Sequence, residues 1–148
     1  MINKIKEFLT KLETKEEKEI NPSQEELNLT CAALLIETAF ADNSLDKEEI
    51  LSIKKLLKEV YELDDLIIEK IVEEGELSVK NSTSLFEYTK PLNQFMSYEN
   101  KVTLVGLMWK IAYADGNLDK YEEHLIRKIS DLLHIDHHDF IQQKLEMR

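Results

Sequence analysis

Residues 107–122 read Leu-Met-Trp-Lys-Ile-Ala-Tyr-Ala-Asp-Gly-Asn-Leu-Asp-Lys-Tyr-Glu, and this stretch decides the fold because an earlier part of the chain resembles it. Residues 41–49 read Ala-Asp-Asn-Ser-Leu-Asp-Lys-Glu-Glu and match residues 114–122 at a constant separation of 73. The match extends backward and pairs Leu34 with Leu107 and Ala39 with Ala112. A repeat at this separation predicts two similar helical units in one small domain.

The composition favours helices throughout. The chain has 148 residues, of which 43% are hydrophobic, but it has only three Gly and two Pro, so it has few places to turn sharply. No stretch alternates with a period of two for long enough to form a strand. We predict an all-α, single-domain bundle of about seven to eight helices. Residues 24–75 and about 98–147 are expected to form two pseudo-twofold-related three-helix units, joined by a helix over 84–96 that Pro91 starts or kinks.

Capping residues indicate where the helices begin and end. Ser23 with Glu26 fits a capping box, in which each side chain accepts a hydrogen bond from a free amide at the helix start. Glycine commonly follows the last residue of a helix, so Gly75 is predicted to end the fourth helix of the chain. The side chains predicted to cap later helices are Asp64 or Asp65, Ser97 and Asp136.

The N-terminal residues differ from the rest of the chain. Ile5, Phe8, Leu9 and Leu12 recur at helical spacing, and a run of mixed charge follows over residues 13–19. The apolar half can dock on a core, whereas its stripe is too short for a membrane-surface helix. We therefore divide the chain into an N-terminal amphipathic and charged helix with its linker, 1–22, and a helical domain, 23–148.

Charge and cysteine content restrict the partners. The formal net charge is −11, which disfavours nucleic-acid binding and favours cations and basic protein partners. A single cysteine, Cys31, allows no disulfide within the chain and is compatible with a reducing compartment. No apolar run approaches the roughly 20 residues that span a membrane, and the N-terminus is too polar for a signal peptide. We expect a cytoplasmic protein without direct membrane insertion.

The two repeated acidic turns have a purely structural explanation. Gly116 in the second copy and Asn43 in the first suit the left-handed conformation that ends a helix. Asp119 and Asp46 would then cap the following helices, with glutamates in the capping-box position three residues later. This explanation needs no ligand.

A cation site is the alternative explanation of the same turns. Asp42 and Asp115 stand at the C-terminal ends of their helices, where a negative charge costs a few tenths to about 1 kcal/mol. Oxygen-bearing side chains also recur at alternate positions, and a turn of this kind can wrap a hard divalent cation such as calcium, which takes six to eight oxygen ligands. The turns are too short for an EF-hand, whose Gly and Glu stand at the sixth and twelfth positions. The candidate ligands are Asp42, Asp46, Glu49, Asp115, Asn117, Asp119 and Glu122, with Ser44 in the first copy.

Other chemically active residues have simpler interpretations. His134 and His138 would share a helix face and hold zinc only if the helix were continuous there, and together with His137 they are better explained as solvated histidines at a turn. Cys31 is interpreted as an inert buried thiol. The aromatic residues near the second turn, Trp109, Tyr113 and Tyr121, are interpreted as core and rim packing, with a surface for a protein partner as the alternative if they are exposed. The sequence has no phosphate-binding loop, nucleophile elbow or HExxH motif, so we expect no enzyme.

The pattern of an apolar helix, Ala114-Asp115-Gly116, Leu118, Asp119 and a glutamate in the next helix resembles the tellurite-resistance TerB family. Residues 41–46 resemble the matching half, with Asn43 departing from the glycine, and the resemblance covers about residues 24–147. It implies an all-α, pseudo-twofold bundle and a cytoplasmic bacterial protein linked to metal-stress or envelope-stress responses. The family's acidic residues suspected of binding metal map onto Asp42, Asp46, Glu49, Asp115, Asp119 and Glu122.

Two functions follow from these observations. The first is a non-enzymatic, divalent-cation-responsive protein-interaction module in a metal, tellurite or envelope stress response, with calcium as the expected cation. The alternative is a plain adaptor or scaffold domain whose acidic turns are only helix caps. The identity of the protein partner and the formation of a homodimer stay open.

Overall fold

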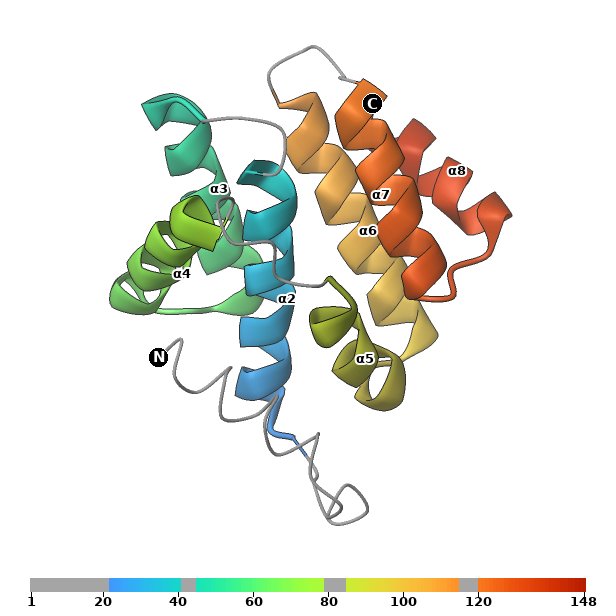
Figure 1. Cartoon of the computed structure of the whole chain (residues 1–148), viewed down its shortest axis with the longest axis horizontal. Coiled ribbons are helices and arrows are strands. Elements are labelled where there is room, and N and C mark those ends of the chain that lie inside the picture. The colour runs from blue at the N-terminus through green and yellow to red at the C-terminus, as the bar shows by residue number, and fades with distance from the viewer. Residues whose placement is uncertain (1–21, 41–44, 79–84, 115–119) are drawn as a thin grey trace.

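The structure is a computed structural model of the chain, and it describes residues 22–40, 45–78, 85–114 and 120–148. Within these ranges every regular element is a helix, and there are seven of them, which confirms the predicted fold class (Figure 1). They are α2 (Gln24–Phe40), α3 (Lys47–Tyr61), α4 (Asp65–Ser78), α5 (Leu85–Phe95), α6 (Tyr98–Tyr113), α7 (Lys120–Leu132) and α8 (His137–Met147). None of these described helices is long and apolar enough to cross a membrane.

The helices form two groups of three that correspond to the two copies of the repeat. In the first group α2 packs on α4 and α3, and in the second α6 packs on α8 and α7. Figure 1 shows α2 and α6 at the centre, α3 and α4 outside α2, α7 and α8 outside α6, and α5 below the centre. The match between α2 and α6, α3 and α7, and α4 and α8 is the one that the 73-residue repeat predicts.

The core forms where the two central helices meet. Leu34 and Leu35 of α2 and Leu104 and Met108 of α6 are almost completely buried. Because α2 is covered by α3, α4, α5, α6 and α7, it is apolar around most of its circumference rather than along one stripe. The peripheral helices α3 and α7 instead carry one apolar face each, which they turn toward the centre.

Most predicted caps are confirmed. The amide of Glu26 donates to Ser23 Oγ (3.1 Å), and the amide of Asn100 donates to Ser97 Oγ (3.2 Å). Of the two candidates for α4, the cap is Asp64, whose Oδ1 accepts from the amide of Ile67 (2.9 Å). Asp136 precedes α8, but its side chain accepts no capping hydrogen bond.

The prediction that Gly75 ends α4 is wrong. The helix continues to Ser78, and Gly75 is buried inside it against α2. A Cβ at position 75 would lie 2.1 Å from Ile36 Cγ2, so glycine is needed for close helix packing and not for a helix end. Pro91 lies inside α5, in its second half, and not at its start.

A buried lysine joins three helices beneath the second unit. Lys101 of α6 is 8% exposed, and its Nζ donates to the carbonyl oxygen of Leu133 (2.9 Å) and to Asn93 Oδ1 (3.2 Å). Asn93 of α5 in turn donates to the carbonyl oxygen of Leu132 (2.7 Å). These donors satisfy carbonyls at the C-terminal end of α7, where a positive charge also complements the helix dipole.

The two helical glycines allow a matched test of the packing. Gly75→Ala places its new methyl group against the branched, buried Ile36, and overpacking of this kind costs about 1–3 kcal/mol, more than the gain in helix propensity of about 1 kcal/mol. Gly106→Ala meets the end of the Gln143 side chain, which can rotate away, so the propensity gain is retained. Thermal unfolding should show a lower Tm for Gly75→Ala and an unchanged or higher Tm for Gly106→Ala. The reverse order would contradict the close α2–α4 contact.

Candidate functional site

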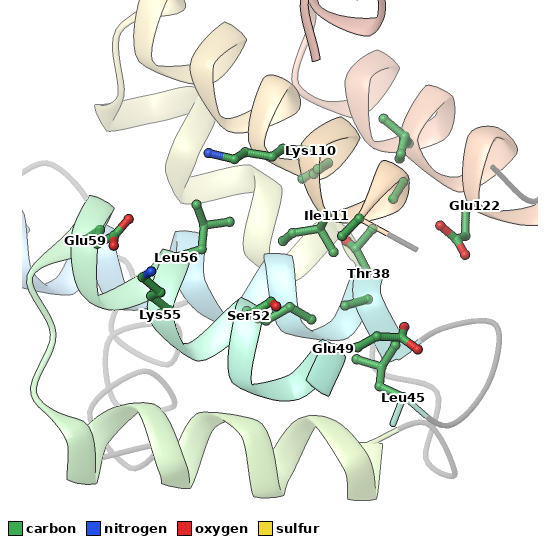
Figure 2. Close-up of a pocket in the computed structure, with 16 residues that line it drawn as sticks. Thr38, Leu45, Glu49, Ser52, Lys55, Leu56, Glu59, Lys110, Ile111 and Glu122 are labelled. Carbon is green, nitrogen blue, oxygen red and sulfur yellow. The ribbon is translucent and has the colours of Figure 1, made fainter. Parts of the chain in front are cut away.

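A cavity of about 260 Å³ lies between the two units, with α3 on one side and α6 on the other (Figure 2). Its floor is apolar, and its rim carries both signs of charge. It is lined by Thr38, Ala39, Leu45, Glu49, Ser52, Ile53, Lys55, Leu56, Glu59, Met108, Lys110, Ile111, Ala112, Ala114, Glu122 and Ile126. This volume lies just below the range of roughly 300–1,000 Å³ that is common for ligand pockets.

The cavity brings together two candidate cation ligands that are far apart in sequence. Glu49 in the first turn of α3 and Glu122 in the first turn of α7 both line it, and both are half-buried. The two residues occupy the same position in the two copies of the repeat. In Figure 2 Glu49 and Glu122 lie at one end of the cavity, while Lys55, Glu59 and Lys110 lie toward the other. The repeat therefore places equivalent carboxylates of both units at one site.

Asp46 has the capping role that its position predicts. Its Oδ1 accepts a hydrogen bond from the amide of Glu49 (2.8 Å), and its backbone is extended, as at the start of other helices. The cap uses one carboxylate oxygen, so it does not by itself conflict with a cation at the other.

The remaining candidate ligands fall outside the part of the chain that the structure describes. These residues are Asp42, Ser44, Asp115, Asn117 and Asp119. Among the described residues no three His, Cys, Asp or Glu side chains are grouped closely enough to hold a metal ion. The described part of the site therefore contributes the two glutamates and the capping Asp46.

The histidines after α7 do not share one helix face. His134 has a φ of 59°, and the amide of Ile135 donates to the carbonyl oxygen of Ser130 (3.0 Å), which is the geometry that terminates a helix. His137 and His138 begin the next helix, and all three side chains are exposed. The interpretation of these residues as solvated histidines is confirmed.

Cys31 is 1% exposed, and its Sγ lies 3.9 Å from the sulfur of Met96. Burial raises the pKa of the Cys31 thiol to about 12, so it carries almost no thiolate at neutral pH. An inert thiol is what the sequence predicted.

Trp109 and Tyr113 have the packing role that was predicted, whereas Tyr121, at the start of α7, is 52% exposed. Trp109 is completely buried between the rings of Tyr113 and Phe140, whose centroids lie 5.8 and 5.3 Å away. Lys144 Nζ lies 5.4 Å from the centre of the Trp109 ring and also pairs with Glu123. These contacts join α6, α7 and α8 on the side of the second unit away from α3.

Sequence reasoning missed the charged end of the cavity. Lys55, Glu59 and Lys110 are exposed polar residues on α3 and α6, and no local motif marks them. A signal was available in the repeat itself, since positions 73 residues apart line the cavity in four pairs: Thr38 with Ile111, Ala39 with Ala112, Glu49 with Glu122, and Ile53 with Ile126.

Comparison with known proteins agrees with the resemblance. The family model described as "Tellurite resistance protein TerB" matches residues 28–145, which is nearly the whole chain. The chain matches no curated protein and no solved structure.

Two substitutions at Asp46 separate capping from charge. Asp46→Asn keeps an oxygen that accepts the Glu49 amide, so stability without added cations should stay within a few tenths of a kcal/mol. Asp46→Ala removes the cap and should lower the free energy of unfolding by about 1 kcal/mol. Urea denaturation in a chelating buffer measures both, and equal losses would contradict the capping role.

Proposed function

We propose, from the premise that the chain belongs to the tellurite-resistance TerB family, that it is a non-enzymatic, divalent-cation-responsive protein-interaction module. One observation carries the proposal: Glu49 and Glu122, equivalent in the repeat, line the same cavity. The acidic turns immediately precede these glutamates in sequence, and we propose that they supply the remaining ligands.

The physical role of the cation follows from charge. The chain has a net charge of −11, and carboxylates close to one another repel. A bound divalent cation offsets this repulsion and fixes the turns relative to α3 and α7. Calcium is the preferred candidate because carboxylate and amide oxygens are its usual ligands. Such an ion would stabilise the end of the bundle where Glu49 and Glu122 lie, and thereby the shape of the surface offered to a partner.

We place this activity in the cytoplasm of a bacterium, in a metal, tellurite or envelope stress response, as the family suggests. A direct role in binding tellurium oxyanions is disfavoured, since an acidic surface repels anions.

A plain adaptor domain without a cation is the second candidate, and one observation favours it. Asp46 Oδ1 accepts the Glu49 amide, which explains an aspartate at this repeated position by helix capping alone. The two candidates differ in whether calcium changes the stability of the fold.

Calcium should raise the Tm of the native chain if the first proposal holds. At ten times its Kd, a ligand that binds only the folded state adds about 1.4 kcal/mol, which raises Tm by about 3–6 °C in a domain of this size. Calorimetry in about 150 mM salt measures this rise. Asp115→Asn and Glu122→Gln should reduce it, whereas Glu146→Gln, on α8 away from the cavity, should retain it.

A native chain whose Tm does not respond to calcium, manganese or zinc would favour the adaptor. Asp115→Asn would then be neutral or slightly stabilising, because it relieves the unfavourable charge at the helix end.

A further inference from the structure

The pseudo-twofold arrangement creates two related grooves between the units, and α5 fills one of them. We call the groove between α2 and α7 the filled groove, because α5 packs on both of these helices. We call the groove between α3 and α6, which contains the 260 Å³ cavity, the open groove. In the repeat, α2 corresponds to α6 and α7 corresponds to α3. The groove between α2 and α7 therefore corresponds to the groove between α6 and α3.

The contacts of α5 show how a helix packs in such a groove. Leu92 and Thr89 are completely buried, and Tyr88 Oη donates to Glu37 Oε1 on α2 (2.9 Å). Burial and the neighbouring Glu37 carboxylate raise the pKa of Tyr88, so this hydrogen bond is kept at neutral pH. At the other end Asn93 donates to the carbonyl oxygen of Leu132 on α7.

The repeat maps these contact positions onto the open groove. The residue equivalent to Glu37 is Lys110, and the residue equivalent to Leu132 is Glu59. Both Lys110 and Glu59 line the cavity. The positions that hold α5 on one side of the molecule therefore border an apolar cavity on the other.

The chain itself contains a segment with the pattern of α5. Ile5, Phe8, Leu9 and Leu12 stand at the same mutual spacing as Leu85, Tyr88, Thr89 and Leu92, at a constant separation of 80. Both sets follow the i, i+3, i+4, i+7 spacing of one helix face. Each set also precedes the central helix of its unit, α2 or α6.

We propose that residues 5–12 dock as a helix in the open groove, as α5 docks in the filled one. This inference goes beyond the proposed function and does not depend on a cation. The N-terminal segment is then the counterpart of α5. Each groove would hold the helix that precedes one of the two central helices in the sequence, α5 before α6 and residues 5–12 before α2.

The length of the connecting chain permits this docking. Thr38, which lines the cavity, lies 14 residues after Gln24, a rise of about 21 Å along α2. Residues 13–21 connect the segment to α2 and span up to about 30 Å when extended. The separation of 80 exceeds the repeat of 73, so this connection is longer than the one from α5 to α6.

Charge also fits. On a helix over residues 5–12 the apolar stripe would be flanked by Lys4, Lys6 and Lys11. The rim of the cavity carries Glu49, Glu59 and Glu122 beside Lys55 and Lys110. Apolar side chains can enter the cavity while the lysines reach Glu59, at the end of the cavity away from Glu49 and Glu122. This arrangement is common for an amphipathic helix in a groove.

Paramagnetic broadening in the full-length chain tests the docking. A nitroxide on Thr10→Cys, opposite the apolar stripe, is attached selectively because the only native cysteine, Cys31, is buried and unreactive. The label should strongly broaden the amide signals of Ser52, Leu56 and Ile111 around the open groove. The amide of Asn93, in the filled groove, should keep most of its intensity.

Two variants and a mixing experiment complete the test. Phe8→Ser with Leu12→Ser should abolish the broadening, and Glu7→Ser, on the opposite side of the predicted helix, should leave it unchanged. Broadening centred elsewhere, uniform broadening, or broadening that survives the double substitution would overturn the proposal. A mixture of spin-labelled and isotope-labelled chains should show no broadening, and broadening there would assign the groove to a second copy instead.

Discussion

The burial of α2 against α6 is the contact on which the rest of the structure depends. Both helices are apolar around most of their circumference, so neither can face water, and each must be covered from several directions. Their mutual contact buries one side of each, and the partner helices of each unit cover the rest. The position of α3 and α4 around α2 is repeated by α7 and α8 around α6, because the same apolar positions occur twice in the chain.

This central pair also determines where chemistry can occur. Once α2 and α6 are in contact, the first turns of α3 and α7 contribute Glu49 and Glu122 to one cavity. The pair also leaves two grooves that are equivalent by the repeat but differ in content, one holding α5 and one lined by an apolar floor with a charged rim. This difference concerns the described residues alone, in which α6 is preceded by α5, whereas the residues before Pro22 lie outside the described ranges.

The sequence predicted the fold well where the signal was periodic or repeated. The helical class, the pairing of the units and the caps at Ser23, Asp46, Asp64 and Ser97 follow from local rules, which depend only on neighbouring residues. The prediction for Gly75 was wrong because its role depends on Ile36 of another helix. The local sequence does not distinguish a glycine needed for close helix packing from a glycine that ends a helix. The cavity was missed for the same reason, as Lys55, Glu59 and Lys110 meet only in three dimensions. The candidate ligands in the two acidic turns remain predictions.

The most direct test of the account is a nitrogen–proton NMR titration of the full chain with calcium in about 150 mM salt. The account predicts saturable shifts concentrated at the amides that flank both turns, including Asp46, Glu49 and Glu122, with both copies following one binding curve. Small, diffuse shifts that do not saturate would mean only screening of an acidic surface. That result would contradict a cation site shared by the two units.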